Sequence, residues 1–406
     1  MTITNMGTNP APQPSRPSPG EQTRRTYERL PYPGTNPKIA TGKGGSLPSL
    51  KWMQALGRPG SPSPERVLVA GCGTGPEAFA IRRQLPEAEI VAVDFSPRSI
   101  AIAKRLQRSA GVTRPITFQV ADLTDSNLVK ETGGNFDLIT CHGVLSYIPN
   151  PGVGLRNFAG LLSPGGALYL GVNGESHPAT RLRPWLAGFG LAVDELRDER
   201  RLRELLGVWD ALHDDGLREL AAMSASYLAG DVCGPHFNNW PLTRWRAAAR
   251  RGGWEIAGSW LLPLALHLLT EGEKYRPLYP ASFGELAERL DHARPAGFHK
   301  LVLRRAHPEP SSGRESSASE STLRWTGLYS ARFPKPPRSA AITVTLHSTV
   351  LNLRLNFTLT PRQAEALREL IAHGATAPDW QPRWGRTEAA RRMLWLWSGL
   401  GVVTAA

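Results

Sequence analysis

Short apolar runs alternate with amphipathic segments through the first half of the chain. The runs that predict buried strands cover residues 66–70, 89–93, 116–120, 136–141 and 167–172. The segments between them that carry helical spacing cover residues 77–84, 97–109 and 153–162. Such alternation is typical of a parallel sheet covered by helices on both faces. We therefore predict an α/β fold, with a Rossmann-like, doubly wound and mostly parallel sheet.

The pattern changes after this core, which we place at 61–175. Residues 185–250 are rich in Leu, Arg, Glu and Trp at helical spacing, and they predict a helical insertion. Residues 254–265 and 297–305 return to strand-like alternation, so a pair of closing strands is expected within 254–305. Together these segments form a predicted main domain at 26–306.

Two segments flank the main domain and lack apolar periodicity. Residues 1–25 contain five prolines and no apolar run, so we expect a disordered, basic, Pro-rich tail. Residues 307–321 read HPEPSSGRESSASES, a composition typical of a flexible linker. The linker separates the main domain from a small C-terminal module at 322–406.

The C-terminal module predicts a small α+β structure. Its alternating runs, which predict strands, are 342–346 and 351–359. A helix is expected between Thr360, as the N-cap of a capping box completed by Gln363, and Gly374, as the residue that ends it.

The charge of the chain is concentrated at its two ends. The net charge is +13, and residues 1–60 hold eight Lys and Arg against two Asp and Glu, while residues 322–406 hold eleven against four. The middle of the chain is therefore neutral, so a polyanion could bind only through the ends. The C-terminal module interleaves aromatic and basic residues: Trp380, Arg383, Trp384, Arg386, Arg391, Arg392, Trp395 and Trp397. This mixture fits a nucleic-acid surface or a docking element with buried tryptophans, and we favour the second.

Other composition features narrow the class of protein. No stretch approaches the roughly 20 apolar residues of a membrane span. Three scattered cysteines, Cys72, Cys141 and Cys233, are too few for a disulfide framework or a structural zinc site, so we expect a reducing cytoplasm. The histidines form no ligand-spaced pair with acids or cysteines, and we predict no metal.

A glycine-rich loop, Gly71-Cys72-Gly73-Thr74-Gly75, follows the first predicted strand directly and precedes a helix. Its backbone amides can face a polar or anionic cofactor group. Pro76 follows the last glycine, and this departure from the dinucleotide fingerprint argues against NAD and FAD. Asp94 ends the second strand, where a carboxylate can accept hydrogen bonds from ribose hydroxyls, and Asp122 ends the third.

Five segments follow one another through the predicted core: VLVAGCGTG, AVDFSPRSIAIAKR, FQVADLTD, FDLITCHGVLSYIPNP and LLSPGGALYLGVN. Together they resemble the successive motifs of the class I S-adenosylmethionine-dependent methyltransferases. The resemblance covers residues 66–173, and the upstream YERLPYP segment at 27–33 is similar to one that precedes the cofactor domain in such proteins. One departure is Val69, where many family members have an acidic residue.

The resemblance implies S-adenosylmethionine as the cofactor and assigns its contacts. Gly71, Gly73 and Gly75 would pass under its methionine part, and Cys72 between them and His142 after the fourth strand are further cofactor-binding candidates. Asp94 would hold the ribose, Phe95 would lie against the adenine, and Asp122 and Leu123 would hold the adenine edge.

Methyl transfer from a sulfonium needs mainly alignment, so a general base is optional. The candidates near the ends of the fourth and fifth strands are His142, Tyr147 and Glu175, with His177 next. His142 fits equally well as a residue that contacts the cofactor. Tyr32 could fold over the site as part of an N-terminal lid, but we favour a packing role for this aromatic residue. We expect a methyltransferase acting on a protein or small-molecule acceptor. The alternatives are a non-catalytic S-adenosylmethionine-binding module and an RNA methyltransferase that uses the basic ends.

Overall fold

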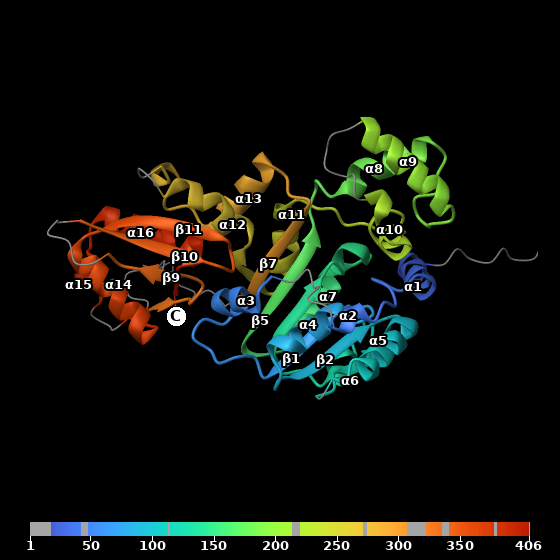
Figure 1. Cartoon of the computed structure of the whole chain (residues 1–406), viewed down its shortest axis with the longest axis horizontal. Helices are drawn as coiled ribbons and strands as arrows, with labels where there is room; N and C mark the ends of the chain where they lie inside the picture. Colours follow the sequence, from blue (N-terminus) through green and yellow to red (C-terminus); the bar gives the residue numbers. More distant parts are fainter. Residues whose placement is uncertain are drawn as a thin grey trace, which may run out of the picture.

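A computed structural model describes residues 18–41, 48–112, 114–212, 220–270, 274–306, 322–334, 341–376 and 380–405. Its centre is a seven-stranded sheet in the order β3-β2-β1-β4-β5-β7-β6 (Figure 1). The strands are β1 (Arg66–Ala70), β2 (Glu89–Asp94), β3 (Thr117–Val120), β4 (Phe136–His142), β5 (Leu162–Asn173), β6 (Trp254–Ser259) and β7 (Phe298–Arg305). Strands β1 to β5 pair in parallel, while β7 runs antiparallel to both β5 and β6. The predicted Rossmann-like α/β sheet is confirmed.

Helices cover both faces of this sheet. Those of the core are α2 (Lys38–Thr41), α3 (Leu50–Gly57), α4 (Pro76–Gln84), α5 (Pro97–Ser109), α6 (Leu128–Thr132), α7 (Pro151–Leu161), α11 (Leu242–Arg251) and α13 (Phe283–Ala293). On one face α7 contacts α6 and α11, and on the other α2 contacts both α4 and α5. The carboxyl ends of β1 to β4 meet at one edge of the sheet, which is where ligands of open α/β sheets bind.

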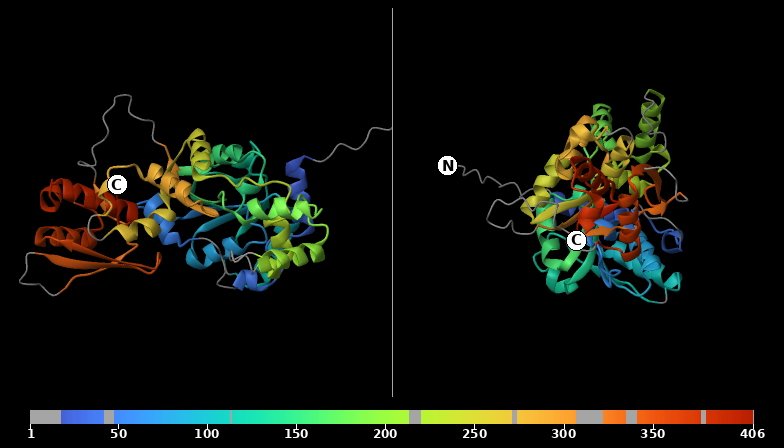
Figure 2. Two further views of the ribbon diagram at one scale, coloured as in Figure 1. Left: turned by 90° about the horizontal axis from the view of Figure 1, so that it is seen from above. Right: turned by 90° about the vertical axis from the view of Figure 1, so that its left-hand side faces the viewer.

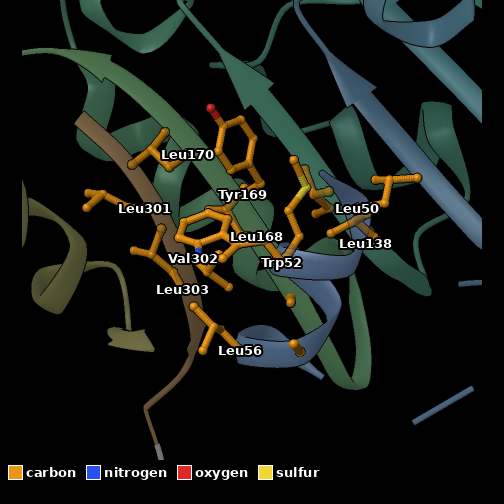
Figure 3. Packing of buried hydrophobic residues seen from close by; sticks show 14 of the residues in the cluster. Leu50, Trp52, Leu56, Leu138, Leu168, Tyr169, Leu170, Leu301, Val302 and Leu303 are labelled. Carbon is orange, nitrogen blue, oxygen red and sulfur yellow. The ribbon is translucent and has the colours of Figure 1, made fainter. Parts of the chain in front are cut away.

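Helix α3 closes the core over β5 and β7. Trp52 on this helix is fully buried and lies among Leu168 and Val302 (Figure 3). Gly57 lets the helix approach closely, since a Cβ there would lie 2.5 Å from the Ala167 Cβ. The ring of Tyr169 belongs to the same cluster, whereas its hydroxyl points away from the cluster (Figure 3).

The insertion after β5 is helical, as predicted. It contains α8 (Pro178–Gly188), α9 (Glu199–Leu212) and α10 (Ala225–Asp231), with a 3-10 turn at Leu220–Ala222. These helices enclose a small apolar core of their own, separate from the core of the sheet. In Figures 1 and 2 they lie at the opposite end of the molecule from the C-terminal module.

Two predicted segments differ in the structure. Residues 19–25 were expected to be disordered but belong to helix α1 (Pro19–Arg29), which Ser18 caps by accepting a hydrogen bond from the Glu21 amide; residues 1–17 lie outside the described residues. The strand expected at 254–265 ends at Ser259, and α12 (Leu261–Leu266) follows. Pro263, which lacks the N–H that a strand interior would donate, lies in the first turn of this helix.

The C-terminal module has the expected α+β structure, and the predicted linker at 307–321 lies outside the described residues. Its strands are β8 (Leu323–Trp325), β9 (Ser330–Arg332), β10 (Ile342–Ser348), β11 (Leu353–Leu359) and β12 (Val403–Ala405), and its helices are α14 (Pro361–His373), α15 (Trp380–Trp384) and α16 (Glu388–Leu400). The capping box of Thr360 and Gln363 is present, and Gly374 ends α14 in the left-handed conformation.

The C-terminal module packs on the main domain through α16 and α12. Gly399 lies so close to the main domain that a Cβ there would be 2.6 Å from both Leu266 and Phe283. In the part of the chain that is described, no helix is long and apolar enough to cross a membrane.

Candidate functional site

A cavity of about 840 Å³ lies at the carboxyl ends of β1 to β4. The chain runs outward from β1 to β3 and then returns to place β4 beside β1, so the strand order reverses at this point. Ligands of open α/β sheets bind in the crevice outside such a reversal. The N-terminal segment also lines the cavity, from Thr23 to Ile39.

The loop after β1 brings its backbone to the cavity surface. Gly71 and Gly73 both line the cavity with positive φ, +72° and +52°. A Cβ at Gly71 would lie 2.3 Å from Val144 Cγ2, and one at Gly73 would lie 2.4 Å from the Tyr32 carbonyl oxygen. The Thr74 amide donates to that same oxygen at 2.9 Å. A side chain at Gly71 would therefore collide with Val144, and one at Gly73 would displace the segment at Tyr32 that covers the loop.

Gly75 differs from the other loop glycines. It is the N-cap of α4, it has φ +102°, and its Cβ position faces Phe79 instead of the cavity. Gly75 is not among the residues that line the cavity and turns the chain into the helix, so its predicted contact with a cofactor stays a prediction. Cys72, between the other two glycines, is buried and lines the cavity.

Asp94 ends β2 with its carboxylate at the cavity. Its two oxygens accept hydrogen bonds from the amides of Gly73 (2.9 Å) and Ser96 (3.0 Å). Burial raises the pKa of this carboxyl to about 6, and the two amide donors oppose that rise. Phe95, the next residue, also lines the cavity and packs against Tyr27.

Asp122 and Leu123 line the cavity beyond β3. The Asp122 carboxylate accepts hydrogen bonds from the amide and hydroxyl of Thr124, at 2.8 and 2.7 Å, so part of its capacity stabilises the turn. The side of the cavity formed by Gly71, Cys72, Gly73, Asp94, Phe95, Asp122 and Leu123 is called the glycine-loop wall below.

His142 ends β4 and lines the cavity beside this wall. Its Nδ1 shares a hydrogen bond of 2.7 Å with the Tyr169 hydroxyl, and its ring lies near Phe298. Burial, and then the charge of Lys300, lower the pKa of this imidazole to about 4. The ring is therefore neutral at physiological pH and has little proton affinity, which makes it a poor general base.

A second group of lining residues, called the tyrosine wall below, adjoins the first and consists of Tyr27, Tyr32, Tyr147, Tyr227 and Asp231. The Tyr147 hydroxyl donates a short hydrogen bond to Oδ1 of Asp231, and Asn173 Nδ2 donates to the Tyr147 oxygen at 3.2 Å. Desolvation raises the pKa of Asp231 to about 6, although the Tyr147 hydrogen bond lowers it. Asp231 is thus a carboxylate at the cavity surface whose pKa lies close to neutral pH.

Of the other predicted catalytic residues, Tyr147 lines the cavity but Glu175 does not. Glu175 is exposed in the turn after β5, outside the residues that line the cavity, so its assignment as a base is wrong. In this turn it is His177, two positions further along, that lines the cavity. His177 caps α8 by accepting from the Ala179 amide, and burial lowers its pKa to about 4.

Sequence reasoning missed Asp231 and Glu77. Asp231 ends a helix of the insertion, 84 positions after its partner Tyr147. Glu77 lies two positions after Gly75, in the first turn of α4, and lines the cavity; an acid in the first turn of a helix is common and by itself gives no functional signal. Four carboxylates line the cavity, Glu77, Asp94, Asp122 and Asp231, against the single ammonium of Lys38.

The tryptophans of the C-terminal module lie in packed positions. Trp384 and Trp397 are buried, and Trp395 donates a hydrogen bond to the Ala281 carbonyl and packs against Phe283 of the main domain. Arg383 and Arg391 form ion pairs with Glu369 and Glu388. This arrangement fits the docking element better than a stacking surface for bases.

Comparisons with known proteins relate part of this chain to methyltransferases. A family model described as "Methyltransferase domain" matches residues 68–168. An uncharacterised protein of Synechococcus is 37% identical over 146 residues, which is 36% of this chain and 33% of that protein. A ubiquinone biosynthesis O-methyltransferase of Xanthomonas axonopodis is 34% identical over 109 residues, 27% of this chain and 43% of that enzyme. This chain spans less than half the length of these curated relatives.

The fold also resembles a solved structure, PKMT2 from Rickettsia typhi in complex with AdoHcy. The TM-score is 0.52 at 15% identity, over 88% of this chain and 75% of that chain, so the likeness concerns the fold. The family match and the sheet together define an α/β methyltransferase domain. It is a class I S-adenosylmethionine-dependent methyltransferase domain, which confirms the resemblance read from the motifs.

Proposed function

We propose that the protein transfers a methyl group from S-adenosylmethionine to a neutral or cationic acceptor, a small molecule or a protein side chain, bound against the tyrosine wall. The observation that carries the proposal is that residues from the ends of β1, β2, β3 and β4 line one cavity together with Asp231, a carboxylate from the insertion. We keep the cytoplasm as the expected location.

The residues present fit S-adenosylmethionine. The glycine-loop wall offers backbone without side chains at Gly71 and Gly73, a carboxylate at Asp94 for ribose hydroxyls, and Phe95 and Leu123 for an adenine ring. A cavity of about 840 Å³ is within the usual range of small-molecule sites. Its excess of carboxylates suits a cofactor that carries a sulfonium and an ammonium.

When bound, S-adenosylmethionine supplies a methyl carbon on a positively charged sulfur. The chain's own residues then have two tasks, which are to hold the acceptor and to take its proton. We assign proton acceptance to Asp231, because its pKa of about 6 leaves it ionised at neutral pH and still basic enough to receive a proton. Tyr147 and Asn173 fix the orientation of that carboxylate.

The charge of the cavity selects the acceptor. Among the described lining residues there is no guanidinium, and Lys38 is the one ammonium, so a phosphate or carboxylate group would meet mainly acids. A hydroxyl or amine fits this surface. The RNA alternative loses support, because its phosphates would be repelled at the site and the C-terminal tryptophans are packed.

The test is calorimetric titration with S-adenosylhomocysteine, followed by assay of labelled methyl transfer into a fractionated cell lysate. We expect micromolar binding, a loss of at least about tenfold in Asp94→Ala, and label in a fraction that ribonuclease does not remove. As a matched control, Asp137→Ala alters a carboxylate that pairs with Arg58 away from the cavity. Folded protein that binds no S-adenosylhomocysteine would refute the proposal, and binding without label in any fraction would favour the non-catalytic module.

A further inference from the structure

Glu77 is a buried carboxylate for which the described residues provide no partner. It lies in the first turn of α4, it is only 9% exposed, and it lines the cavity. No described residue donates a hydrogen bond to it or forms an ion pair with it. The other two buried or half-buried acids of the cavity differ, since Asp94 accepts from two amides and Asp231 from a tyrosine.

The charge of Glu77 is expensive in this position. Burial raises the pKa of its carboxyl to about 8. The helix N-terminus favours a negative charge, but that contribution is small beside the cost of removing a carboxylate from water. A buried acid without a partner, directed into a cavity, is explained most simply by a cationic ligand group that completes it.

The surroundings of Glu77 place it away from the adenosine residues. Burial raises the pKa of Cys72 in the glycine loop, of Cys141 near the end of β4 and of Tyr169 of β5, and the nearby charge of Glu77 adds to each rise, as it does for Tyr32. Asp94 and Asp122, by contrast, follow β2 and β3. Within the sheet order, Glu77 therefore faces the β1–β4–β5 side of the cavity.

Resting on the proposed function, we infer that Glu77 pairs with the α-ammonium group at the methionine end of S-adenosylmethionine. Strand β1 offers no acid for this purpose, because its last residues, Val69 and Ala70, are apolar and buried. The helix that follows the glycine loop supplies the carboxylate instead. Glu77 thus distinguishes ligands that carry the amino-acid end from those that carry the nucleoside alone.

Three ligands separate the charges that Glu77 could meet. Of the cationic groups, S-adenosylmethionine has an ammonium and a sulfonium, S-adenosylhomocysteine has the ammonium alone, and 5′-methylthioadenosine has neither; the two amino-acid ligands also share an α-carboxylate. Calorimetry of wild type, Glu77→Gln and Glu77→Ala should show both amino-acid ligands weakened by roughly 10- to 100-fold in the variants, as for loss of a charged hydrogen-bond partner. The affinity for 5′-methylthioadenosine should change by less than about twofold, which also shows that the variants are folded.

The matched control is Glu87→Gln. Glu87 is an exposed acid that follows the C-terminal end of α4 and pairs with Arg114. The variant should leave all three affinities unchanged. Equal binding of S-adenosylhomocysteine by wild type and Glu77→Gln would overturn the inference while the proposed function stands. Weakening of S-adenosylmethionine alone would also overturn it, because the partner would then be the sulfonium. If wild type binds none of the three ligands, the proposed function itself fails.

Discussion

The two walls of the cavity are built in different ways. The glycine-loop wall comes from residues that directly follow three consecutive strands, so each position is set by local chain geometry. The tyrosine wall collects residues from α1, the segment after it, the turn after β4 and α10, up to about 200 positions apart. The first wall is therefore a property of the sheet, and the second depends on how the insertion and the N-terminal segment pack over it.

This difference predicts that the walls can be disabled separately, and the largest effect is expected at Asp231. Asp231→Asn removes the proposed proton acceptor but keeps the shape of the side chain. We expect labelled methyl transfer to the acceptor fraction to fall by roughly 100-fold or more, while S-adenosylhomocysteine affinity stays within about twofold. Initial rates and calorimetry on the same preparation measure both quantities.

Glu175→Gln serves as the control for that experiment, because Glu175 is an exposed acid close to the cavity but outside it. Its rate should equal that of wild type. A full rate in Asp231→Asn, or an equal loss in both variants, would contradict the assignment of the proton acceptor.

On the glycine-loop side, Glu77 should cost stability in the absence of ligand. Its folded-state pKa of about 8 lies above the ordinary 4.5, so the folded protein keeps a proton that the unfolded chain has released between these values. The contribution to stability is present below about pH 4.5 and is lost as the pH rises through 8. Gln does not titrate, so Glu77→Gln should exceed wild type by roughly 2 to 4 kcal/mol at pH 9.

Denaturant unfolding at pH 5, 7 and 9 without ligand measures this difference in the free energy of unfolding. The advantage of Glu77→Gln should grow with pH, and Glu87→Gln should show no such trend. A pH-independent difference would mean that Glu77 is ionised at all three values and has a cationic partner within the chain.

The contrast between the walls also explains what could be predicted from sequence. The strand ends, the loop at Gly71 and the acid at Asp94 follow from short apolar runs with fixed neighbours, and all three lie at the cavity. Asp231 and Tyr147 meet only because the insertion folds back, and no periodicity reports that contact. Glu175 is a candidate base by its sequence position just after β5. The direction of the turn there places His177, and not Glu175, at the cavity.

The predicted bounds of two segments, the strand after Trp254 and the N-terminal tail, differ from those in the structure. The strand expected to run from Trp254 to 265 ends at Ser259, where the consecutive apolar residues Trp260, Leu261 and Leu262 replace the alternation and the chain becomes helical. The Pro-rich start hid α1, since proline is accepted in the first turn of a helix and Ser18 provides the cap.

A smaller effect is expected far from both walls, at the contact between the C-terminal module and the main domain. Trp395→Ala removes a ring packed against Phe283 and the hydrogen bond to the Ala281 carbonyl, and it should cost roughly 1 to 3 kcal/mol of unfolding free energy. The matched control is Arg391→Ala, which breaks an exposed ion pair and should cost less than about 1 kcal/mol. If Arg391→Ala retained RNA less well than wild type in a salt-dependent way, with unchanged stability, the nucleic-acid-binding interpretation of the C-terminal module would regain support.

The smallest predicted effect lies within the tyrosine wall and concerns pH. Methyl transfer at saturating S-adenosylmethionine should rise with pH through about 6, as Asp231 loses its proton. The Tyr147 hydroxyl stabilises the ionised form by donating to it, so Tyr147→Phe should raise the pKa of Asp231 and move the midpoint of the profile to higher pH. The rate should then fall by a few-fold near pH 6 and recover above pH 8, because the carboxylate itself is still present. An unchanged midpoint with a uniform loss at every pH would show that Tyr147 positions the acceptor and does not tune the carboxylate.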